Sequence, residues 1–239
     1  MKSKKYFLLI CSGIYLFLSC TSSSTKYIKP EYMKKSQKDA QLLMAPILEV
    51  AFNLTDEIKK ELNITSTEQE HADFFKNNLV HNLKQQIQGQ IFLATVYPDD
   101  QTFSTHKLSV KNAYFQMDIP DSTTWINNEI FTDGYILFLE GINFYISKTD
   151  KDSSRPEDFY EISGRKVNEA TWHPMRYYKY YLHYDLKYAI MDHSMQIFVA
   201  YGKINLKKTI KEKVELELTA SECVQKITEE ILKSTPYVN

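Results

Sequence analysis

YKYYLHYDLKYAIMDHSMQIFVAYGKINLKKT, residues 178–209, is the stretch that decides the fold. Apolar or aromatic residues fill every second position of its first half, and lysine, histidine and aspartate stand between them. This period of two predicts a strand with one buried face and one wet face. A turn at residues 192–195 then leads into a returning strand, so the stretch predicts a long antiparallel hairpin. The expected buried face carries Tyr178, Tyr180, Leu182, Tyr184, Leu186, Tyr188 and Ile190, and the wet face carries Lys179, His183, Asp185 and Lys187.

The chain upstream begins with a strand and a helix. Residues 42–50 are a short apolar run with Pro46 near its end, which suits a buried strand. Ser66 and Gln69 have capping-box spacing, and Gly89 stands where a helix C-cap belongs. An apolar stripe at helical spacing lies between them, formed by Ala72, Phe75, Leu79, Leu83 and Ile87.

The middle of the chain supplies more sheet. Residues 91–97 suit a second strand, which completes a β-α-β unit, and residues 135–146 are apolar enough for a central strand. Residues 113–117 are a candidate for an extra strand, and Asp121 for the cap of a short helix. The polar residues 148–176 show no period and are expected to be a loop insertion.

The chain closes with a predicted helix. Thr219 and Glu222 have capping-box spacing at its start. Its apolar stripe is formed by Cys223, Val224, Ile227 and Ile231. The predicted fold is therefore α/β in the α+β sense, a single domain over residues 41–239. It has a mixed sheet of about five strands with helices mainly on one face, and it ends in the long hairpin and the C-terminal helix.

The first residues predict export and a lipid anchor. A lysine-rich start precedes an apolar run over residues 6–18, too short for the roughly 20 residues that span a bilayer, so residues 1–19 are expected to be a signal peptide. LFLSC, residues 16–20, resembles the lipobox of bacterial lipoproteins; Ser19 and Cys20 match, and Phe17 departs from the usual Leu. This resemblance implies diacylglycerol on Cys20 in the cell envelope. Residues 20–40 are then the lipidated cysteine and a polar linker, and Thr21, where some inner-membrane lipoproteins carry Asp, favours the periplasmic face of the outer membrane.

Three stretches carry a wider resemblance: LLMAPI at residues 42–47, DGYILFLEGI at 133–142 and YDLKYAIMDHSMQIFVAYG at 184–202. They resemble the α/β domain of periplasmic lipoproteins of the curli-secretion (CsgG), penicillin-binding-protein-activator (LpoB) and TolB amino-terminal type. They resemble still more the small lipoproteins auxiliary to ABC transport. The acidic turn of that pattern usually carries a Gly, and Ser194 and Met195 stand here instead. The resemblance implies a non-enzymatic scaffold that docks other envelope proteins.

The search for catalytic chemistry finds no known motif. No nucleophile elbow, HExxH, Walker loop or paired CxxC occurs. His183 and Asp185 lie two residues apart on the predicted wet face, near Asp192 and His193, and these types of side chain bind Zn²⁺. No third ligand has motif spacing, so we expect a solvated face with no catalytic residue, metal ligand or cofactor. A metal-dependent enzyme or a small-ligand binder is an alternative.

The remaining reactive side chains predict structural roles. Cys223 falls on an apolar helical stripe, where a free cysteine is usually a small buried hydrophobe rather than a nucleophile. His71 and His81 have no partner at i, i+4 and are expected at the surface. The net charge of −1 lacks the basic excess of a nucleic-acid binder, so no nucleic acid is expected as a partner.

One aromatic run suggests a contact surface. TWHPMRYYKYY, residues 171–181, is explained either by strand propensity and core packing or by a partner contact, since Tyr, Trp and Arg dominate interface hot spots. Its candidate contact residues are Trp172, Arg176, Tyr177 and Tyr178. We therefore expect a membrane-anchored module that binds another envelope protein, with homo-oligomers possible. An oligomeric secretion pore of the curli-secretion kind is the main alternative.

Overall fold

The protein is described by a computed structural model that covers residues 20–33, 39–47, 50–94, 103–110, 113–121, 131, 133–152, 176–210, 216–233, 235 and 237. A seven-stranded mixed sheet forms its centre, in the order β1-β9-β8-β7-β2-β4, and β3 also pairs with β7. Its strands are β1 (Cys20–Ile28), β2 (Leu42–Met44), β3 (Val50–Asn53), β4 (Ile91–Leu93), β7 (Tyr135–Asp152), β8 (Arg176–Asp192) and β9 (Ile197–Ile210). A separate hairpin consists of β5 (Phe103–Val110) and β6 (Ala113–Pro120), and the helices are α2 (Asp56–Leu62), α3 (Glu68–Gln86) and α5 (Leu216–Leu232).

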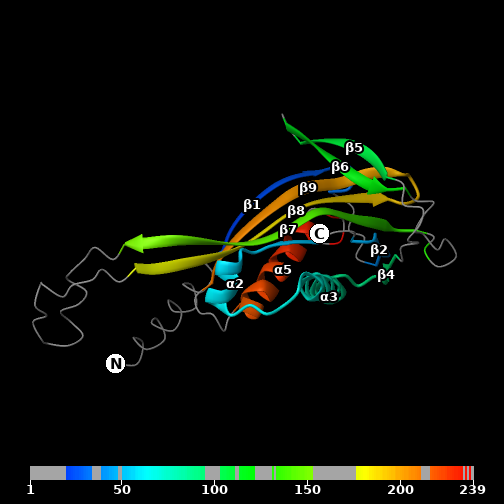
Figure 1. The fold of residues 1–239 in the computed structure, drawn as a ribbon. Helices are drawn as coiled ribbons and strands as arrows, with labels where there is room; N and C mark the ends of the chain where they lie inside the picture. Colours follow the sequence, from blue (N-terminus) through cyan, green and yellow to red (C-terminus); the bar gives the residue numbers. More distant parts are fainter. Residues whose placement is uncertain are drawn as a thin grey trace, which may run out of the picture.

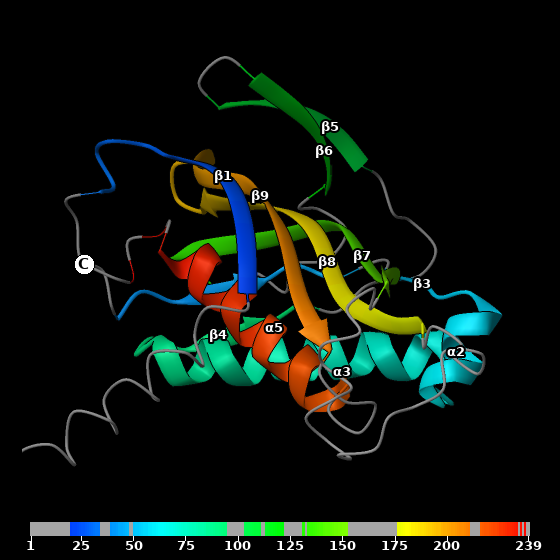
Figure 2. The same cartoon turned by 90° about the vertical axis from the view of Figure 1, so that its left-hand side faces the viewer.

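The elements form layers on the two faces of the sheet. In the described part of the chain, helices α2, α3 and α5 lie against one face, and the β5–β6 hairpin lies over part of the other (Figures 1 and 2). The larger core fills the space between helices and sheet, and a smaller core lies under the hairpin. The predicted α/β class with helices on one face is therefore confirmed, and the sheet is larger than the five strands expected.

The predicted β8–β9 hairpin is confirmed, and its faces show why it lies at the centre. Leu182, Tyr184 and Leu186 point into the helix-side core with at most 1% of each side chain exposed. On the opposite face, Ala189 and Met191 are also buried because the β5–β6 hairpin covers that end of the strand. The alternation predicts a solvent-exposed face along the whole strand. Only the half of this face that lies away from the turn is solvent-exposed.

The β-α-β prediction is confirmed in its pairing and corrected in its details. β2 and β4 are parallel neighbours, with Leu42 opposite Ile91. Residues 42–50 do not form one strand, because the run is interrupted after β2 and resumes in β3. The capping box uses Thr67 and Glu70, whose side chains bond each other's backbone N–H, one residue later than Ser66 and Gln69. The helix ends at Gln86, before Gly89.

Three boundaries differ from the sequence-based expectation. Residues 20–28 are an edge strand of the sheet and not part of a linker. The expected insertion 148–176 begins and ends inside strands, since β7 runs to Asp152 and β8 starts at Arg176. Thr219 and Glu222 do not cap α5, because the helix already begins at Leu216 and Thr219 is buried within it. The candidate strand 113–117 is β6 of the separate hairpin.

Some expectations fall outside the described residues. They concern the signal peptide over residues 1–19, the short helix after Asp121 with Trp125, the end of the 91–97 strand, and Trp172. Within the ranges that are described, no helix is both long enough and apolar enough to cross a membrane.

Candidate interaction face and anchor strand

The candidate lipidation site, Cys20, is the first residue of β1 and sits at one end of the sheet. It lies opposite Lys208 of β9, which lies opposite Leu182 of β8, which in turn lies opposite Ile146 of β7. We call this row the level of Cys20. Because β1 pairs with β9 along all nine of its residues, the backbone that would carry the lipid is part of the sheet itself.

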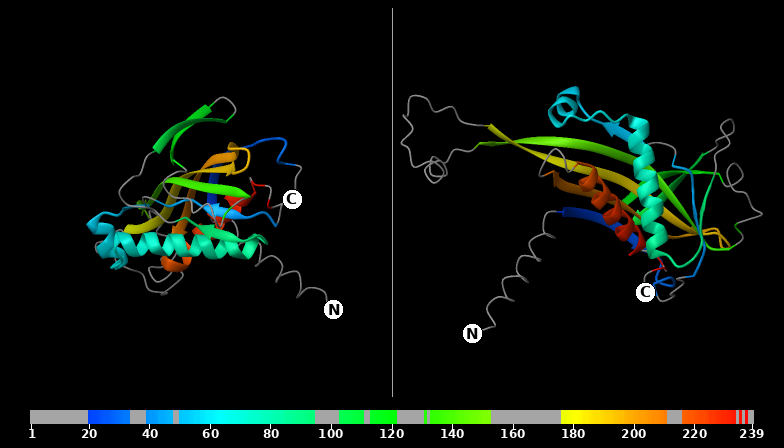
Figure 3. Two further views of the ribbon diagram at one scale, coloured as in Figure 1. Left: turned by 90° about the vertical axis from the view of Figure 1, so that its right-hand side faces the viewer. Right: turned by 90° about the horizontal axis from the view of Figure 1, so that it is seen from below.

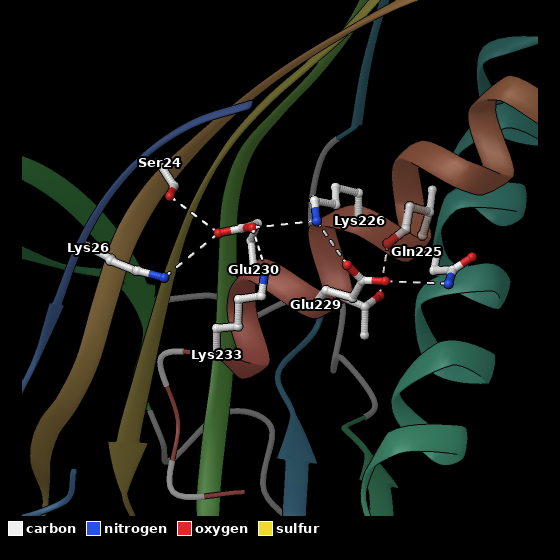
Figure 4. Close-up of polar contacts among 9 residues, drawn as sticks. Ser24, Lys26, Gln225, Lys226, Glu229, Glu230 and Lys233 are labelled. Carbon is white, nitrogen blue, oxygen red and sulfur yellow. Dashed lines mark hydrogen bonds and ion pairs between the residues drawn. The ribbon is translucent and has the colours of Figure 1, made fainter. Parts of the chain in front are cut away.

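A charged cluster holds β1 against α5 (Figure 4). Glu230 of α5 is only 8% exposed, and its carboxylate accepts a hydrogen bond from Ser24 Oγ at 3.3 Å (Figure 4). Lys26 of β1 lies 3.8 Å from the same carboxylate, and Lys233 donates to it at 3.0 Å. Burial favours a higher pKa for the Glu230 carboxyl, but the Lys233 hydrogen bond and the charges of Lys233, Lys26 and Lys226 lower it below its usual value.

The predicted contact residues lie where β7 and β8 extend furthest. Arg176 and Tyr177 are paired with Asp152 and Lys151 at the start of β8. Tyr178 is 39% exposed, and the Nζ atom of Lys148 lies 3.7 Å from the centre of its ring. We call residues 148–152 with 176–180 the ribbon. Arg176, Tyr177 and Tyr178 are consecutive residues of β8, and the register places them opposite Asp152, Lys151 and Asp150.

A polar face lies on the side of the sheet away from the helices, and it includes residues of β1, which we call the anchor strand. One row across four strands consists of Ser23, Asn205, Asp185 and Asn143. A hollow of about 520 Å³ opens on this face. We call the row and the hollow together the polar face. The residues lining the hollow are Ser22, Ser23, Tyr145, His183, Asp185, Lys203, Asn205, Leu206 and Lys207.

Aromatic and basic groups border this row. The rings of Tyr145 and His183 stack at 4.3 Å with an angle of 7° between their planes. His183 Nε2 is hydrogen-bonded to Ser147 Oγ at 2.8 Å. Burial and the charge of Lys207 lower the pKa of His183, and Asp185 acts in the opposite direction. Burial therefore favours the neutral imidazole, and the lysines that line the hollow are Lys203 and Lys207.

The acidic, histidine and cysteine side chains considered in the sequence do not gather at one place in the described residues. The described ranges contain no group of three or more His, Cys, Asp and Glu side chains that could hold a metal ion. Asp192 and His193 lie at the far end of β8, away from Asp185. Asp192 accepts a hydrogen bond from Tyr32 at 2.8 Å. The predicted burial of Cys223 is confirmed, since its side chain is 0% exposed in α5.

The sequence placed two side chains wrongly: Tyr178, expected on the buried face of β8, is exposed, and His71, expected at the surface, is buried. His71 is 8% exposed, and its Nε2 is hydrogen-bonded to the hydroxyl of Tyr184. The available signal was its spacing, because His71 stands four residues before Phe75 and so belongs to the buried stripe of α3. His81, by contrast, is exposed as predicted.

Comparison with known proteins gives only distant similarities. No family model and no curated protein matches the chain. Two structures of the PelC dodecamer from Paraburkholderia phytofirmans, one of them a single-residue variant, are 6% and 7% identical. They align with 92% of this chain and with 100% and 99% of their own, at TM-scores of 0.34 and 0.39. A homolog of neuraminyllactose-binding hemagglutinin from Helicobacter pylori is 9% identical over 84% of each chain, with a TM-score of 0.33. Since these TM-scores are below 0.5, the similarities establish neither a family nor an activity.

Proposed function

We propose that this chain is a bacterial envelope lipoprotein that is held to a membrane through acylated Cys20 and binds another envelope protein without catalysing a reaction. The outer membrane, facing the periplasm, is the proposed location because Thr21 follows the cysteine. The observation that carries the proposal is the polar face, which the helices and the β5–β6 hairpin leave uncovered beside the anchor strand.

The chemistry of the polar face supports a protein partner with acidic and hydroxyl-bearing side chains. Lys203 and Lys207 each stand two residues from Asn205 on β9, on either side of it, so two ammonium groups and an amide are directed to the same side. Asp185 and Asn143 add an acceptor and a further amide in the same row. Complementary charge of this kind fixes register and speeds association more than it raises affinity.

A non-enzymatic role is supported by what the polar face offers chemically. The hydrogen bond between Ser147 and His183 joins a hydroxyl to a base, as in a nucleophilic triad. A triad also needs a carboxylate that orients the histidine. The nearest carboxylate in the row is Asp185, and His183 keeps a lowered pKa in spite of it. Metal analysis of the purified protein is expected to give a stoichiometry near zero. A full equivalent of metal would favour the alternative, a metal-dependent enzyme using His183 and Asp185.

Photocrosslinking in the native cell tests the partner. A photoreactive residue replaces Asn205 on the polar face, a second replaces Trp172 in the aromatic run, and a third replaces Lys76 on the exposed side of α3 as the matched control. We expect a discrete adduct from position 205 and none from position 76. Changing Lys203 and Lys207 to alanine should weaken that adduct. An abundant protein that gives no adduct from position 205 would overturn the assignment of the polar face.

Mass spectrometry of the native protein tests the anchor separately. We expect an N-terminal residue at position 20 that carries diacylglycerol on sulfur, and Cys20→Ser should abolish both the modification and membrane retention. Detection of Met1, or of an unmodified sulfur at position 20, would remove the envelope placement and with it the proposed function.

The secretion-pore alternative has its own discriminating measurement. A strand that crosses a bilayer in a barrel needs about 9 to 11 residues. The ribbon contributes residues 148–152 and 176–180 in the described part of the chain. Gel filtration of the detergent-solubilised lipoprotein decides the matter: a stable ring would favour the pore, and a monomer would exclude it.

A further inference from the structure

The ribbon projects past the level of Cys20. β9 ends at Ile210, opposite Tyr180, while β7 and β8 continue to the pair Asp152 and Arg176. Figure 3 shows the two strands reaching well beyond β1 and β9 at the same end of the sheet. Arg176 lies six residues beyond Leu182 in β8, which corresponds to about 20 Å of extended chain. The ribbon and the candidate lipid site therefore share one end of the molecule.

Three tyrosines, two of them in contact with lysines, lie beyond the level of Cys20 on the two faces of the sheet. Tyr178 and Tyr180 lie on the helix-side face, and Tyr181 lies on the polar face. Lys148 Nζ lies 3.7 Å from the ring centre of Tyr178, and Lys207 Nζ lies 4.1 Å from that of Tyr181. Tyrosine is enriched where proteins cross the headgroup region of a membrane, and lysine extends its ammonium group to the water there.

The anchor strand has no slack that could lift the sheet away from the bilayer. All nine residues of β1 pair with β9, and Ser24 and Lys26 are bound to Glu230. The acyl chains on Cys20 would have to enter the hydrocarbon layer from the sheet end itself. Any part of the sheet that projects further at that end then meets the bilayer.

The charge balance of the ribbon's base suits this position. Lys148 donates to Glu61 at 2.6 Å and to Glu57 at 3.1 Å, so α2 compensates its charge. The hydroxyl of Tyr180 donates to Glu61 at 2.7 Å. These groups satisfy one another, which lowers the cost of placing them in a headgroup layer that is less polar than water.

We infer that the ribbon lies in the headgroup region of the same membrane that takes up the acyl chains of Cys20, with Tyr178, Tyr180 and Tyr181 at the membrane–water interface. The inference rests on the proposed lipidation of Cys20. It makes this part of the aromatic run a membrane contact rather than a docking site for a protein. The lipid then orients the sheet, and it sets the distance of the polar face from the membrane surface.

Fluorescence quenching by spin-labelled lipids tests the inference in the full lipoprotein. Lys179→Cys introduces a thiol on the exposed ribbon, and Met195→Cys introduces one at the far turn of the same hairpin, where the native side chain is 64% exposed. Selective labelling is feasible because Cys223 is buried and the sulfur of Cys20 carries lipid in the proposed state. The labelled proteins are reconstituted into vesicles of phosphatidylethanolamine and phosphatidylglycerol that contain a headgroup-level nitroxide.

We expect strong loss of fluorescence for the label at position 179 and none at position 195. The loss should shrink in a Tyr178→Ser, Tyr181→Ser background, which removes two of the three interface rings. No quenching at position 179, or equal quenching at both positions, would overturn the inference. Mass spectrometry of the same sample separates the two proposals: acylated Cys20 with an unquenched ribbon refutes only the membrane contact, whereas an unmodified Cys20 refutes both.

Discussion

The hydroxyl of Tyr184 lies 3.1 Å from Nε2 of His71, in the core between α3 and the sheet. The ring of Phe144 packs against the same imidazole at 3.9 Å between centroids. Burial lowers the pKa of His71 from 6.5 to about 4. The folded protein therefore holds this histidine neutral, as a hydrogen-bonding partner for a tyrosine that is itself completely buried.

This pair predicts a loss of stability in mild acid. Between pH 6.5 and about 4, His71 binds a proton in the unfolded chain but not in the folded one, so the free energy of unfolding falls as the pH falls through that window. The full effect of this group is about 3 kcal/mol. Urea denaturation of the mature chain carrying Cys20→Ser, at pH values across the window, measures it.

Two glutamine variants serve to assign that pH dependence. His71→Gln should flatten the slope between pH 6.5 and 4, because the buried titrating group is gone. His81→Gln changes an exposed histidine of the same helix and should keep the original slope. An unchanged slope in His71→Gln would show that other groups cause the acid sensitivity.

Cys223 should react as a buried thiol. Its side chain is 0% exposed within the helix-side core, and a thiol reagent needs access and a thiolate. We expect modification of the mature chain carrying Cys20→Ser to follow the rate of unfolding and to become fast only above the urea midpoint. Cys223→Ala should cost roughly 1 kcal/mol of stability, as for the loss of a small buried group. Rapid modification in native buffer would contradict the structural role.

The strands that were predicted correctly are those in which apolar and polar side chains follow the buried and exposed faces of the sheet. In β8 the alternation of Tyr184, Leu186 and Tyr188 with charged residues follows from one packed face. The sequence predicts a linker at β1 because its serines and threonines show no apolar pattern. It is an edge strand fixed by backbone pairing to β9 and by Glu230, which lies 206 residues from Ser24 in the sequence.

The candidate site shows the same limit. His183 and Asp185 could be placed on one wet face by their spacing alone. The neighbours that complete the polar face, Asn205 and Ser23, come from strands whose register depends on the whole sheet. The helix cap was misplaced by one residue, since two overlapping sequences fit the capping-box spacing and only Glu70 reaches back to the Thr67 backbone.

Glu230→Gln should loosen β1 from α5. The variant keeps the shape of the side chain but removes the charge that faces Lys26 and Lys233. We expect a loss of about 1–3 kcal/mol and faster amide exchange over residues 22–28. Glu229→Gln is the matched control, because Glu229 is one-third exposed and its salt bridge is to Lys226. That control should cost no more than about 1 kcal/mol and leave the exchange of β1 unchanged.

Gly202→Val should displace β1 while the rest of the sheet persists. A Cβ atom at position 202 would lie 2.5 Å from the carbonyl oxygen of Thr25 and 2.9 Å from Cε1 of Tyr188. The ring is buried and the oxygen belongs to the backbone, so the strand must move away from β9. Overpacking of this kind costs about 1–3 kcal/mol. Hydrogen exchange should show lost protection across residues 22–28 and little change in β8.

Gly141→Ala provides a control with a similar overall cost and a different location. Its Cβ would meet no atom within 4 Å, but the positive φ of 62° strains any residue other than glycine by about 1–2 kcal/mol. In the lipoprotein, Gly202→Val should also reduce the quenching of a label at position 179. A detached β1 would act as a flexible tether and let the ribbon move away from the membrane, whereas the native strand holds it there. Equal quenching in Gly202→Val and Gly141→Ala would mean that the pairing of β1 with β9 does not hold the ribbon at the membrane.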